Sequence, residues 1–344
     1  MNINRLLRKN ILALKPYSSA RDEYTGEAMV FLDANENPFN KPYNRYPDPL
    51  QRAVKEKISN LKIIPVENIF LGNGSDEPID LLIRAFCEPG TDNIVTIDPT
   101  YGMYQVAADI SGVGLRKVSL TPDYKLDVTA LLATTDKNTK LIFLCSPNNP
   151  TGNSLEKEAV LKVLKTFKGL VIVDEAYIDF APGKSLIKEL NDFSNLVLLQ
   201  TFSKAWGMAG IRLGMAFASA EIISVLNKIK YPYNLNILTQ QKALELLEQD
   251  KQVEDWVQLL IEQRKEMVEQ LNALPFVIRV HPSDANFLLV KMHDSRGIYD
   301  YLVEEGIIVR DRSKVHLCEG SLRITIGSEE ENRILIETLK KLID

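Results

Sequence analysis

The order of apolar and polar residues divides the chain into two parts. Between Glu67 and Ala220, short apolar runs alternate with helical segments, and the runs are ENIFLGNG, DNIVTIDP, KLIFLCSP, GLVIVDEA, NLVLLQTF and LGMAFASA. Strands without polar alternation are buried on both faces. This part of the chain therefore predicts an α/β fold, in which helices cover both faces of a mostly parallel sheet.

After about Asn234 the pattern changes to long helices. The segment DWVQLLIEQRKEMVEQLNAL repeats its large apolar residues at the helical period. A smaller α+β unit follows, with strands expected in FVIRV, NFLLVK, IIVR and LRITIG, and Ser328 with Glu331 predicts a capping box for the last helix. We expect a large domain over 36–244 and a small C-terminal domain over 245–344.

The N-terminal residues carry a further helical pattern. The apolar side chains at helical spacing are Ile3, Leu6, Leu7, Ile11 and Leu14. The basic residues among them superficially resemble a transit peptide, but the stretch is poor in serine and has no long apolar run. We expect a short amphipathic helix that packs on the body of the protein, within an N-terminal arm over 1–35. No window approaches the roughly 18 apolar residues of a membrane span, so we expect no membrane partner.

The composition is that of an ordinary globular protein. The chain has 344 residues, of which 45% are hydrophobic and 25% charged, and it carries a net charge of -5. That charge gives no basic field for nucleic acid, so we expect no nucleic-acid partner. Cys87, Cys145 and Cys318 are far apart, which is typical of reduced thiols in the cytoplasm. The histidines lack ligand spacing, and we predict no metal.

Polar residues follow several of the predicted strands directly, at 72–75, 147–152, 174–177 and 201–204. In an open α/β sheet the ligand crevice lies beyond the carboxyl ends of the strands. We therefore expect these loops to meet at one site. The first of them, in LGNGSDEPIDLLIRAF, is a glycine-rich turn before a helix, and the N–H groups at a helix N-terminus bind phosphate. Its spacing matches no nucleotide motif, and a plain connection explains it equally well.

The remaining loops carry candidate chemistry. Lys204 stands among small residues in TFSKAWGMAGIRLG, with Arg212 downstream, although a surface turn explains the stretch taken alone. Asp174 follows a buried strand, Tyr177 comes soon after it, and Asn149 lies in the rigid turn PNNPTG. A helix cap or an ordinary turn accounts for each of these in isolation. Together they form the set that a phosphorylated pyridine cofactor needs when it is bound as a lysine Schiff base.

The motifs also resemble those of a known family. TFSKAWGMAGIRLG, DEAY, PNNPTG, GNGSDE, PTYGMY, LDANENP and RYPDP are similar to motifs of the fold-type I pyridoxal-phosphate-dependent aminotransferases, most closely of the histidinol-phosphate aminotransferase family. The resemblance runs from PYSSAR to RITIG. Met208, Met215 and a GS after RITI depart from it without removing a reactive group. It implies a seven-stranded sheet in the large domain and a small α+β domain built from the N- and C-terminal segments.

The resemblance implies roles for particular residues. Lys204 forms the Schiff base with pyridoxal 5'-phosphate and shuttles the proton, while Asp174 pairs with the ring nitrogen. The ring oxygen would be bound by Tyr177 and Asn149, and the ring stacked by Tyr101. The residues expected around the cofactor phosphate are Gly74, Ser75, Thr201, Ser203, Arg212 and, from the second subunit of a homodimer, Tyr46. Those expected to face the substrate are Tyr17, Asn35, Arg310 and Arg323.

The implied reaction interconverts histidinol phosphate and 2-oxoglutarate with imidazole acetol phosphate and glutamate, by a ping-pong mechanism in histidine biosynthesis. An arginine fork binds a carboxylate or a phosphate, which places Arg323 at a shared anion site. An aromatic amino-acid aminotransferase and a threonine-phosphate decarboxylase on the same scaffold remain open. A cofactor-sensing regulator is disfavoured, because only about thirty residues precede LDANENP and a helix-turn-helix module needs more.

Overall fold

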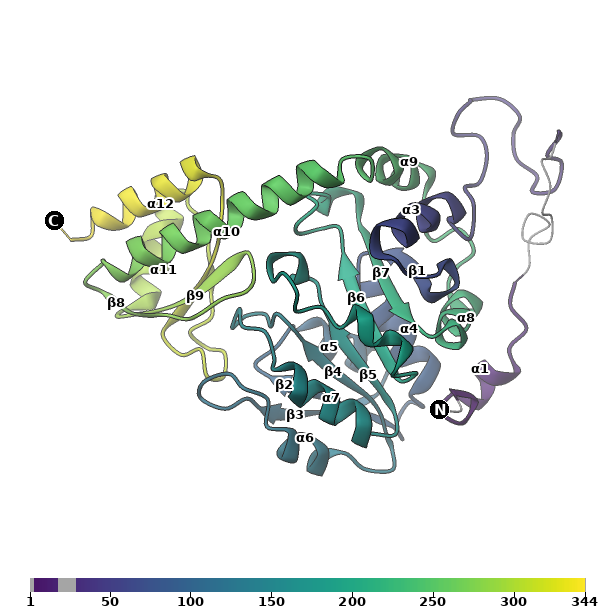
Figure 1. The fold of residues 1–344 in the computed structure, drawn as a ribbon, viewed down its shortest axis with the longest axis horizontal. Coiled ribbons are helices and arrows are strands. Elements are labelled where there is room, and N and C mark those ends of the chain that lie inside the picture. The colour runs from purple at the N-terminus through teal and green to yellow at the C-terminus, as the bar shows by residue number, and fades with distance from the viewer. Residues whose placement is uncertain (1–2, 18–28, 344) are drawn as a thin grey trace.

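The computed structural model of the protein describes residues 3–17 and 29–343, which form two sheets with their helices (Figure 1). The larger sheet has seven strands in the order β1-β7-β6-β5-β4-β2-β3. Their bounds are β1 (Ile69–Asn73), β2 (Asn93–Asp98), β3 (Gly114–Ser119), β4 (Thr139–Cys145), β5 (Leu170–Asp174), β6 (Leu196–Thr201) and β7 (Leu213–Ala218). Only β7 runs antiparallel to its neighbours. The predicted α/β class is confirmed.

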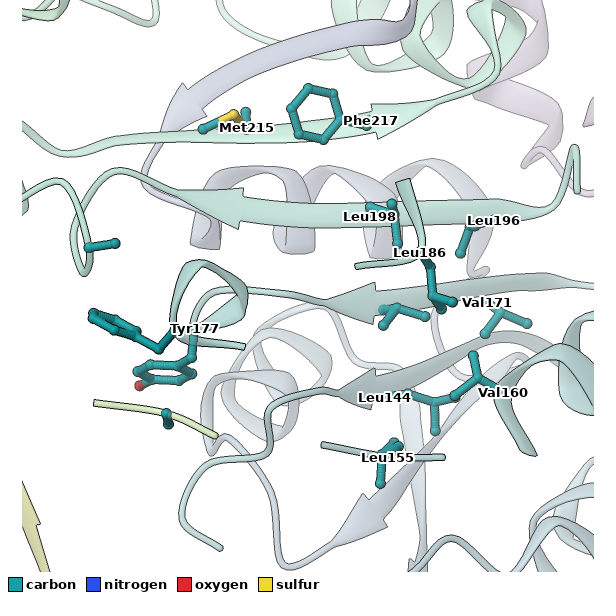
Figure 2. Close-up of a cluster of buried hydrophobic side chains, with 14 of the residues drawn as sticks. Leu144, Leu155, Val160, Val171, Tyr177, Leu186, Leu196, Leu198, Met215 and Phe217 are labelled. Atoms are coloured by element: carbon teal, nitrogen blue, oxygen red, sulfur yellow. The ribbon is translucent and has the colours of Figure 1, made fainter. Parts of the chain in front are cut away.

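The central strands are buried on both faces, as their unbroken apolar runs predict. One face packs against α4 (Asp76–Phe86), α5 (Met103–Ile110) and α8 (Ala220–Ile229). The other face packs against α3 (Arg52–Lys62), α6 (Val128–Thr134) and α7 (Lys157–Thr166). In Figure 2, Leu144, Val171 and Leu198 come from neighbouring strands and belong to the cluster on this second face. Helices on both sides therefore exclude water from the sheet.

The strand β3 was not predicted from the apolar runs of the sequence. It pairs in parallel with β2 at the edge of the sheet, and only Val118 of its residues is buried. An edge strand with one partner leaves most of its side chains in water, so GLRKVS lacks the apolar run that marks the inner strands.

The C-terminal part forms the smaller sheet, in the order β10-β11-β9-β8. Its strands are β8 (Val277–Val280), β9 (Phe287–Met292), β10 (Arg310–Asp311) and β11 (Ser321–Thr325), and its helices are α11 (Ser295–Glu304) and α12 (Glu329–Lys340). The long helix α10 (Asp250–Asn272) runs from α9 (Ile237–Leu246), beside the larger sheet, to the smaller one (Figure 1). The predicted capping box of α12 is confirmed, because Ser328 and Glu331 each accept the other's backbone N–H.

The strand predicted in IIVR is shorter than expected. Only Arg310 of that run pairs with β11, and the chain turns soon afterwards, where Asp311 accepts the backbone N–H of Ser313 at 2.8 Å. Ile307 and Val309 still pack against the core of the smaller unit. Their apolar character therefore reflects packing rather than strand pairing.

The N-terminal residues form two short pieces instead of one helix. A 3-10 turn (Ile3–Arg5) precedes α1 (Lys9–Ala13), and Arg8 between them is extended, so that its N–H donates to the carbonyl of Ala85 at 3.1 Å. Ile3 is buried against the helices beside the larger sheet. The segment therefore packs on the body, as expected, although PYSSAR continues past residue 17 into 18–21, outside the described residues. The domain bounds 1–35, 36–244 and 245–344 stay a prediction. No helix in the described ranges is long and apolar enough to cross a bilayer.

Candidate active site

A cleft lies where the strands of the larger sheet end. The loops predicted to meet at one site all contribute to it. Its lining residues are Gly74, Ser75, Asp76, Tyr101, Cys145, Asn149, Asp174, Ala176, Tyr177, Thr201, Ser203, Lys204 and Arg212. Every residue predicted to bind the cofactor within its own chain is among them, so the structure brings these side chains together.

Asp174 lies at the carboxyl end of β5 and is buried. Its Oδ2 accepts the hydroxyl of Tyr104 at 2.7 Å, and its Oδ1 accepts the backbone N–H of Ala176 at 3.1 Å. Burial raises the pKa of Asp174, and the hydrogen bond from Tyr104 lowers it. Burial has the larger effect, so the pKa of Asp174 is raised to about 6. A cation in the cleft would stabilise the ionised carboxylate at this position.

Lys204 follows β6 and extends into the same cleft, with Nζ 5.6 Å from the centroid of the Tyr177 ring. Desolvation lowers the pKa of this amine, and the charges of Arg323 and Arg212 lower it further. A lowered pKa leaves a larger fraction of the neutral amine at neutral pH, and the neutral form is the nucleophile. The arrangement therefore offers a reactive amine beside a buried acid.

A chain of hydrogen bonds connects the two parts of the molecule across the cleft. Asn149 donates its Nδ2 to the hydroxyl of Tyr177 at 3.2 Å and accepts Nη1 of Arg323 at 2.5 Å. Arg323 comes from β11, and its guanidinium lies over the ring of Phe287 at 5.3 Å. The smaller sheet thus places a cation next to the amide and phenol of the larger unit.

The turn that carries Asn149 is held by the neighbouring amide. Asn148 is fully buried, accepts the hydroxyl of Thr100 at 2.9 Å and donates to the carbonyl of Pro99 at 3.0 Å. It also donates to Thr151 at 2.7 Å. These bonds fix PNNPTG rigidly, which keeps the side chain of Asn149 pointed at the cleft.

Gly74, Ser75 and Arg212 form one end of the cleft, at the start of α4. Gly74 has a φ of +67°, and a Cβ there would lie 2.6 Å from Nη2 of Arg212. Arg212 reaches Ser203 with Nη1 at 3.5 Å, and Thr201 donates to Ser203 at 3.0 Å. Hydroxyls, a guanidinium and a helix N-terminus are the groups that bind a phosphate dianion.

The Tyr101 ring lies beside the cleft and is oriented from two sides. Its hydroxyl donates to Asp76 at 3.1 Å, and its ring meets the edge of Tyr104 at 5.6 Å and 86°. Sequence reasoning missed Tyr104. In the sequence Tyr104 has the pattern of an ordinary core residue of a helix, so only its contact with Asp174 identifies it as part of the site.

Two of the predicted substrate residues lie together. Arg310 and Arg323 are paired residues of β10 and β11. A third arginine, Arg312, was also missed, and its Nε is buried with no hydrogen-bond partner in the described part of the chain. Burial and the charges of Arg323 and Arg310 lower the pKa of Arg312. Three guanidinium groups that repel one another predict an anionic ligand.

The other predicted residues lie outside this cleft. Tyr17 is 71% exposed, Asn35 is exposed with a φ of 53°, and Tyr46 is 50% exposed with its ring stacked on Tyr233 at 4.4 Å. The prediction for Tyr46 concerns the cleft of a second subunit, which a single chain does not test. Their roles stay a prediction.

Comparison with known proteins gives consistent matches over the whole chain. Residues 27–339 match the family model described as aminotransferase class I and II. The chain is 57% identical over 341 residues to a histidinol-phosphate aminotransferase of Parabacteroides distasonis, covering 99% of each chain. It is 58% identical over 340 residues to one of Bacteroides fragilis, covering 98% of this chain and 99% of the other. The crystal structure of the histidinol-phosphate aminotransferase from Clostridium acetobutylicum superposes with a TM-score of 0.81 at 28% identity, covering 88% of this chain and 91% of that chain.

Proposed function

Because the chain belongs to the class I and II aminotransferases, we propose that it transfers an amino group from glutamate to imidazole acetol phosphate, giving 2-oxoglutarate and histidinol phosphate, as a step of histidine biosynthesis. Relatives that share 57% and 58% of its residues carry that activity in their names. The observation that carries the proposal is that Lys204 and Asp174 line one cleft, and that Arg323 donates a hydrogen bond to Asn149 of the same cleft. It unites a reactive amine, a buried acid and an anion receptor.

The cofactor is pyridoxal 5'-phosphate, and the residues of the cleft fit it. The cradle at Gly74, Ser75 and Arg212 matches its phosphate, and the buried carboxylate of Asp174 matches a protonated ring nitrogen. Asn149 and Tyr177 together offer an amide and a phenol for the ring oxygen. When bound, the cofactor supplies a conjugated ring that draws electrons from the α-carbon of the substrate and carries the amino group between the two half-reactions.

Lys204 has two tasks at this site. Its amine would hold the cofactor covalently, and the same amine, when free, would take the proton from the α-carbon of the substrate and return it in the other half-reaction. Both tasks need the neutral amine, which desolvation and the nearby charges of Arg323 and Arg212 favour by lowering the pKa of Lys204.

Asp174 has the complementary task of holding a positive charge. Its ionised carboxylate keeps a proton on the ring nitrogen, because the two opposite charges stabilise each other in a buried site. Burial alone disfavours the ionised form and raises the pKa of Asp174 to about 6. The hydrogen bonds to this carboxylate therefore support the charged state that the reaction needs.

The arginines of the smaller sheet bind the two substrates in turn. Glutamate presents a carboxylate and imidazole acetol phosphate presents a phosphate, and a guanidinium fork accepts either anion. Arg323 is in contact with Asn149, so an anion bound to it lies near the cleft. Arg310, opposite Arg323, adds the further charge that a phosphate dianion requires. One anion site that serves both substrates requires them to bind one after the other, as they do in a ping-pong mechanism.

We place the enzyme in the cytoplasm, where its free cysteines stay reduced.

The enzyme acts as a homodimer. The segment that follows residue 28 exposes large apolar side chains: Met29 is 99% exposed, Leu32 91% and Phe39 76%. Exposed apolar surface of this kind is typical of protein–protein contacts. A two-fold contact through this segment would bring Tyr46, Tyr17 and Asn35 toward the cleft of the partner. The 36–244 and 245–344 domains then form one composite site per subunit.

A half-transamination assay tests the proposal. The purified protein is loaded with cofactor, and the absorption band of the covalently bound form is followed on adding histidinol phosphate, phenylalanine or threonine phosphate. We expect histidinol phosphate to discharge the band at the lowest concentration, and we expect Lys204→Ala to lack this band and to complete no half-reaction. A stronger response to phenylalanine would indicate an aromatic aminotransferase. Release of carbon dioxide from threonine phosphate would indicate a decarboxylase, and either result would overturn the assignment.

A further inference from the structure

The Tyr104 side chain is held rigidly behind the acid of the cleft. It belongs to the first turn of α5 and is fully buried. Its ring stacks on Phe143 at 4.9 Å and 25°, and meets Tyr101 at 5.6 Å and 86°. These contacts fix the ring from two sides and therefore fix the position of its hydroxyl oxygen. The hydroxyl donates to Oδ2 of Asp174 at 2.7 Å.

The second oxygen of Asp174 also has a fixed partner. Oδ1 accepts the backbone N–H of Ala176 at 3.1 Å, so each carboxylate oxygen is tied to a different element. Two such bonds determine the plane of the carboxylate and leave its remaining lone pairs for the cleft. We propose that Tyr104 is a positioning residue that holds the Asp174 carboxylate ionised and in one orientation for the ring nitrogen of the cofactor.

The electrostatic balance around Asp174 makes this bond decisive. Desolvation raises the pKa of Asp174 to about 6, and the hydrogen bond from Tyr104 is the largest influence in the opposite direction. Burial beside Asp174 raises the pKa of Tyr104 well above that of a free phenol, so the hydroxyl stays a donor at neutral pH. The other titratable groups that act on Asp174 are Asp76, Tyr101, Cys145, Tyr177 and Lys204. Of all these groups, Tyr104 is the one that donates a side-chain hydrogen bond to this carboxylate in the described structure.

The inference rests on the proposed role of Asp174 at the ring nitrogen, and it does not depend on which amino donor the enzyme uses. Its test is the affinity of the apoprotein for pyridoxal 5'-phosphate as a function of pH, measured from the quenching of protein fluorescence. The variant is Tyr104→Phe, which keeps the ring and removes the hydroxyl. Its matched control is Tyr124→Phe, because Tyr124 is also a buried tyrosine whose hydroxyl donates one bond, to the carbonyl of Leu317 at 2.8 Å.

We expect the affinity of the Tyr104→Phe apoprotein to fall on acidification at a pH about one unit higher than in the wild type, since a hydrogen bond to a charged group stabilises that charge by an amount worth about one pKa unit or more. Near pH 6 the dissociation constant should rise by about fivefold, and the ratio should approach tenfold at lower pH. The cofactor's own titration is common to both proteins and cancels in the comparison. Tyr124→Phe should lose thermal stability but keep the wild-type pH profile. Tyr104→Phe with an unshifted profile would overturn the inference and leave Tyr104 as a packing residue.

A second pair of variants separates the role of Tyr104 from the proposed role of Asp174, on which it rests. Asp174→Asn should weaken cofactor binding and remove from its pH dependence the part that is due to Asp174, and adding Tyr104→Phe to it should shift nothing further. If Asp174→Asn binds the cofactor like the wild type, the proposed role of Asp174 fails. If Asp174→Asn weakens binding while Tyr104→Phe leaves the profile unshifted, only the role of Tyr104 fails.

A measurement on the wild-type apoprotein covers the case in which Tyr104→Phe does not fold. With tyrosine labelled by carbon-13 at Cζ, one resonance should shift as Asp174 titrates near pH 6 and should lose that shift in Asp174→Asn. A spectrum in which no tyrosine follows this titration would contradict a phenol bonded to Asp174.

Discussion

Arg310 and Arg323 lie directly opposite each other across the antiparallel pair of β10 and β11. Like charges at paired positions on neighbouring strands repel, and the repulsion here is increased by Arg312 nearby. Bound anions remove that cost. The smaller sheet is therefore least stable without a ligand and gains stability when an anion binds between its arginines.

The two arginines should contribute differently to the reaction. Arg323→Gln should weaken both half-reactions by about 10- to 100-fold in kcat/KM, because a charge-assisted bond to each anionic substrate contributes roughly 1.5–3 kcal/mol. Arg310→Gln should weaken the reaction of histidinol phosphate more than that of glutamate, because the dianion needs the second charge. Separate kinetics of the two half-reactions measure this. An Arg323→Gln loss confined to glutamate would show that Arg310 holds the phosphate instead.

The amine of Lys204 should react at lower pH than an ordinary lysine. Its pKa is lowered by desolvation and by Arg323 and Arg212, so the neutral form prevails from a pH below the usual value of about 10.4 for lysine. The rate at which the apoprotein forms a borohydride-reducible adduct with pyridoxal 5'-phosphate should therefore rise with pH through a midpoint below that value. Arg323→Gln should raise the midpoint, because it removes one repelling charge.

The lowered pKa of Lys204 also determines how its contribution to the stability of the fold changes with pH. Between its lowered folded pKa and its unfolded pKa, Lys204 binds fewer protons in the folded state than in the unfolded one, so its contribution to stability rises with pH over that window. Lys204→Ala should form no adduct with pyridoxal 5'-phosphate. Its free energy of unfolding should also lack the rise with pH that Lys204 contributes. A wild-type midpoint equal to that of a free lysine side chain would contradict the electrostatic description of the cleft.

Gly74→Ala should damage the phosphate cradle. Gly74 has a φ of +67°, and a Cβ would lie 2.6 Å from Nη2 of Arg212. The left-handed backbone costs about 1 kcal/mol for alanine, and the displaced guanidinium should weaken cofactor binding as well. Gly90→Ala is the control, because Gly90 has a φ of +68° with nothing within 4 Å of its Cβ. Both variants should lose similar thermal stability, and only Gly74→Ala should bind pyridoxal 5'-phosphate more weakly. Equal affinities would place the cofactor phosphate elsewhere.

Tyr46 should act in the cleft of the partner subunit. Mixing Tyr46→Phe subunits with Lys204→Ala subunits gives hybrid dimers in which one cleft carries both changes and the other carries neither. If the sites are shared, an equal mixture should have roughly a quarter of all sites intact, with cofactor affinity close to the wild type. Activity and cofactor titration of the mixture measure this. Cofactor binding as weak as in the Tyr46→Phe homodimer would mean that Tyr46 acts within its own chain.

The sequence predicted the parts of the molecule whose environment is uniform along a segment. Inner strands such as β4 and β5 are buried on both faces, so their apolar runs identify them, and Asp174 follows β5 at the edge where ligands bind. The edge strand β3 could not be identified in this way, because only one of its residues is buried.

The sequence did not identify Tyr104 and Arg312, because the role of each depends on a contact with another residue of the site. Tyr104 contacts Asp174 across a sequence separation of 70 residues, and Arg312 is significant because it lies beside Arg323. A buried tyrosine in an amphipathic helix has the pattern of an ordinary core residue. Only the tertiary contact distinguishes it, and that contact leaves no local trace in the sequence.

The amide of Asn149 has a further property that bears on how long the enzyme lasts. Its nitrogen donates to Tyr177 and its oxygen accepts from Arg323, so conversion to aspartate would replace the donor by an acceptor and put a negative charge beside Arg323. Spontaneous deamidation of asparagine proceeds when the backbone nitrogen of the next residue loses its proton and attacks the side chain. The next residue here is Pro150, which has no backbone N–H. The bridging amide is therefore protected against this form of chemical ageing by its own neighbour in the chain.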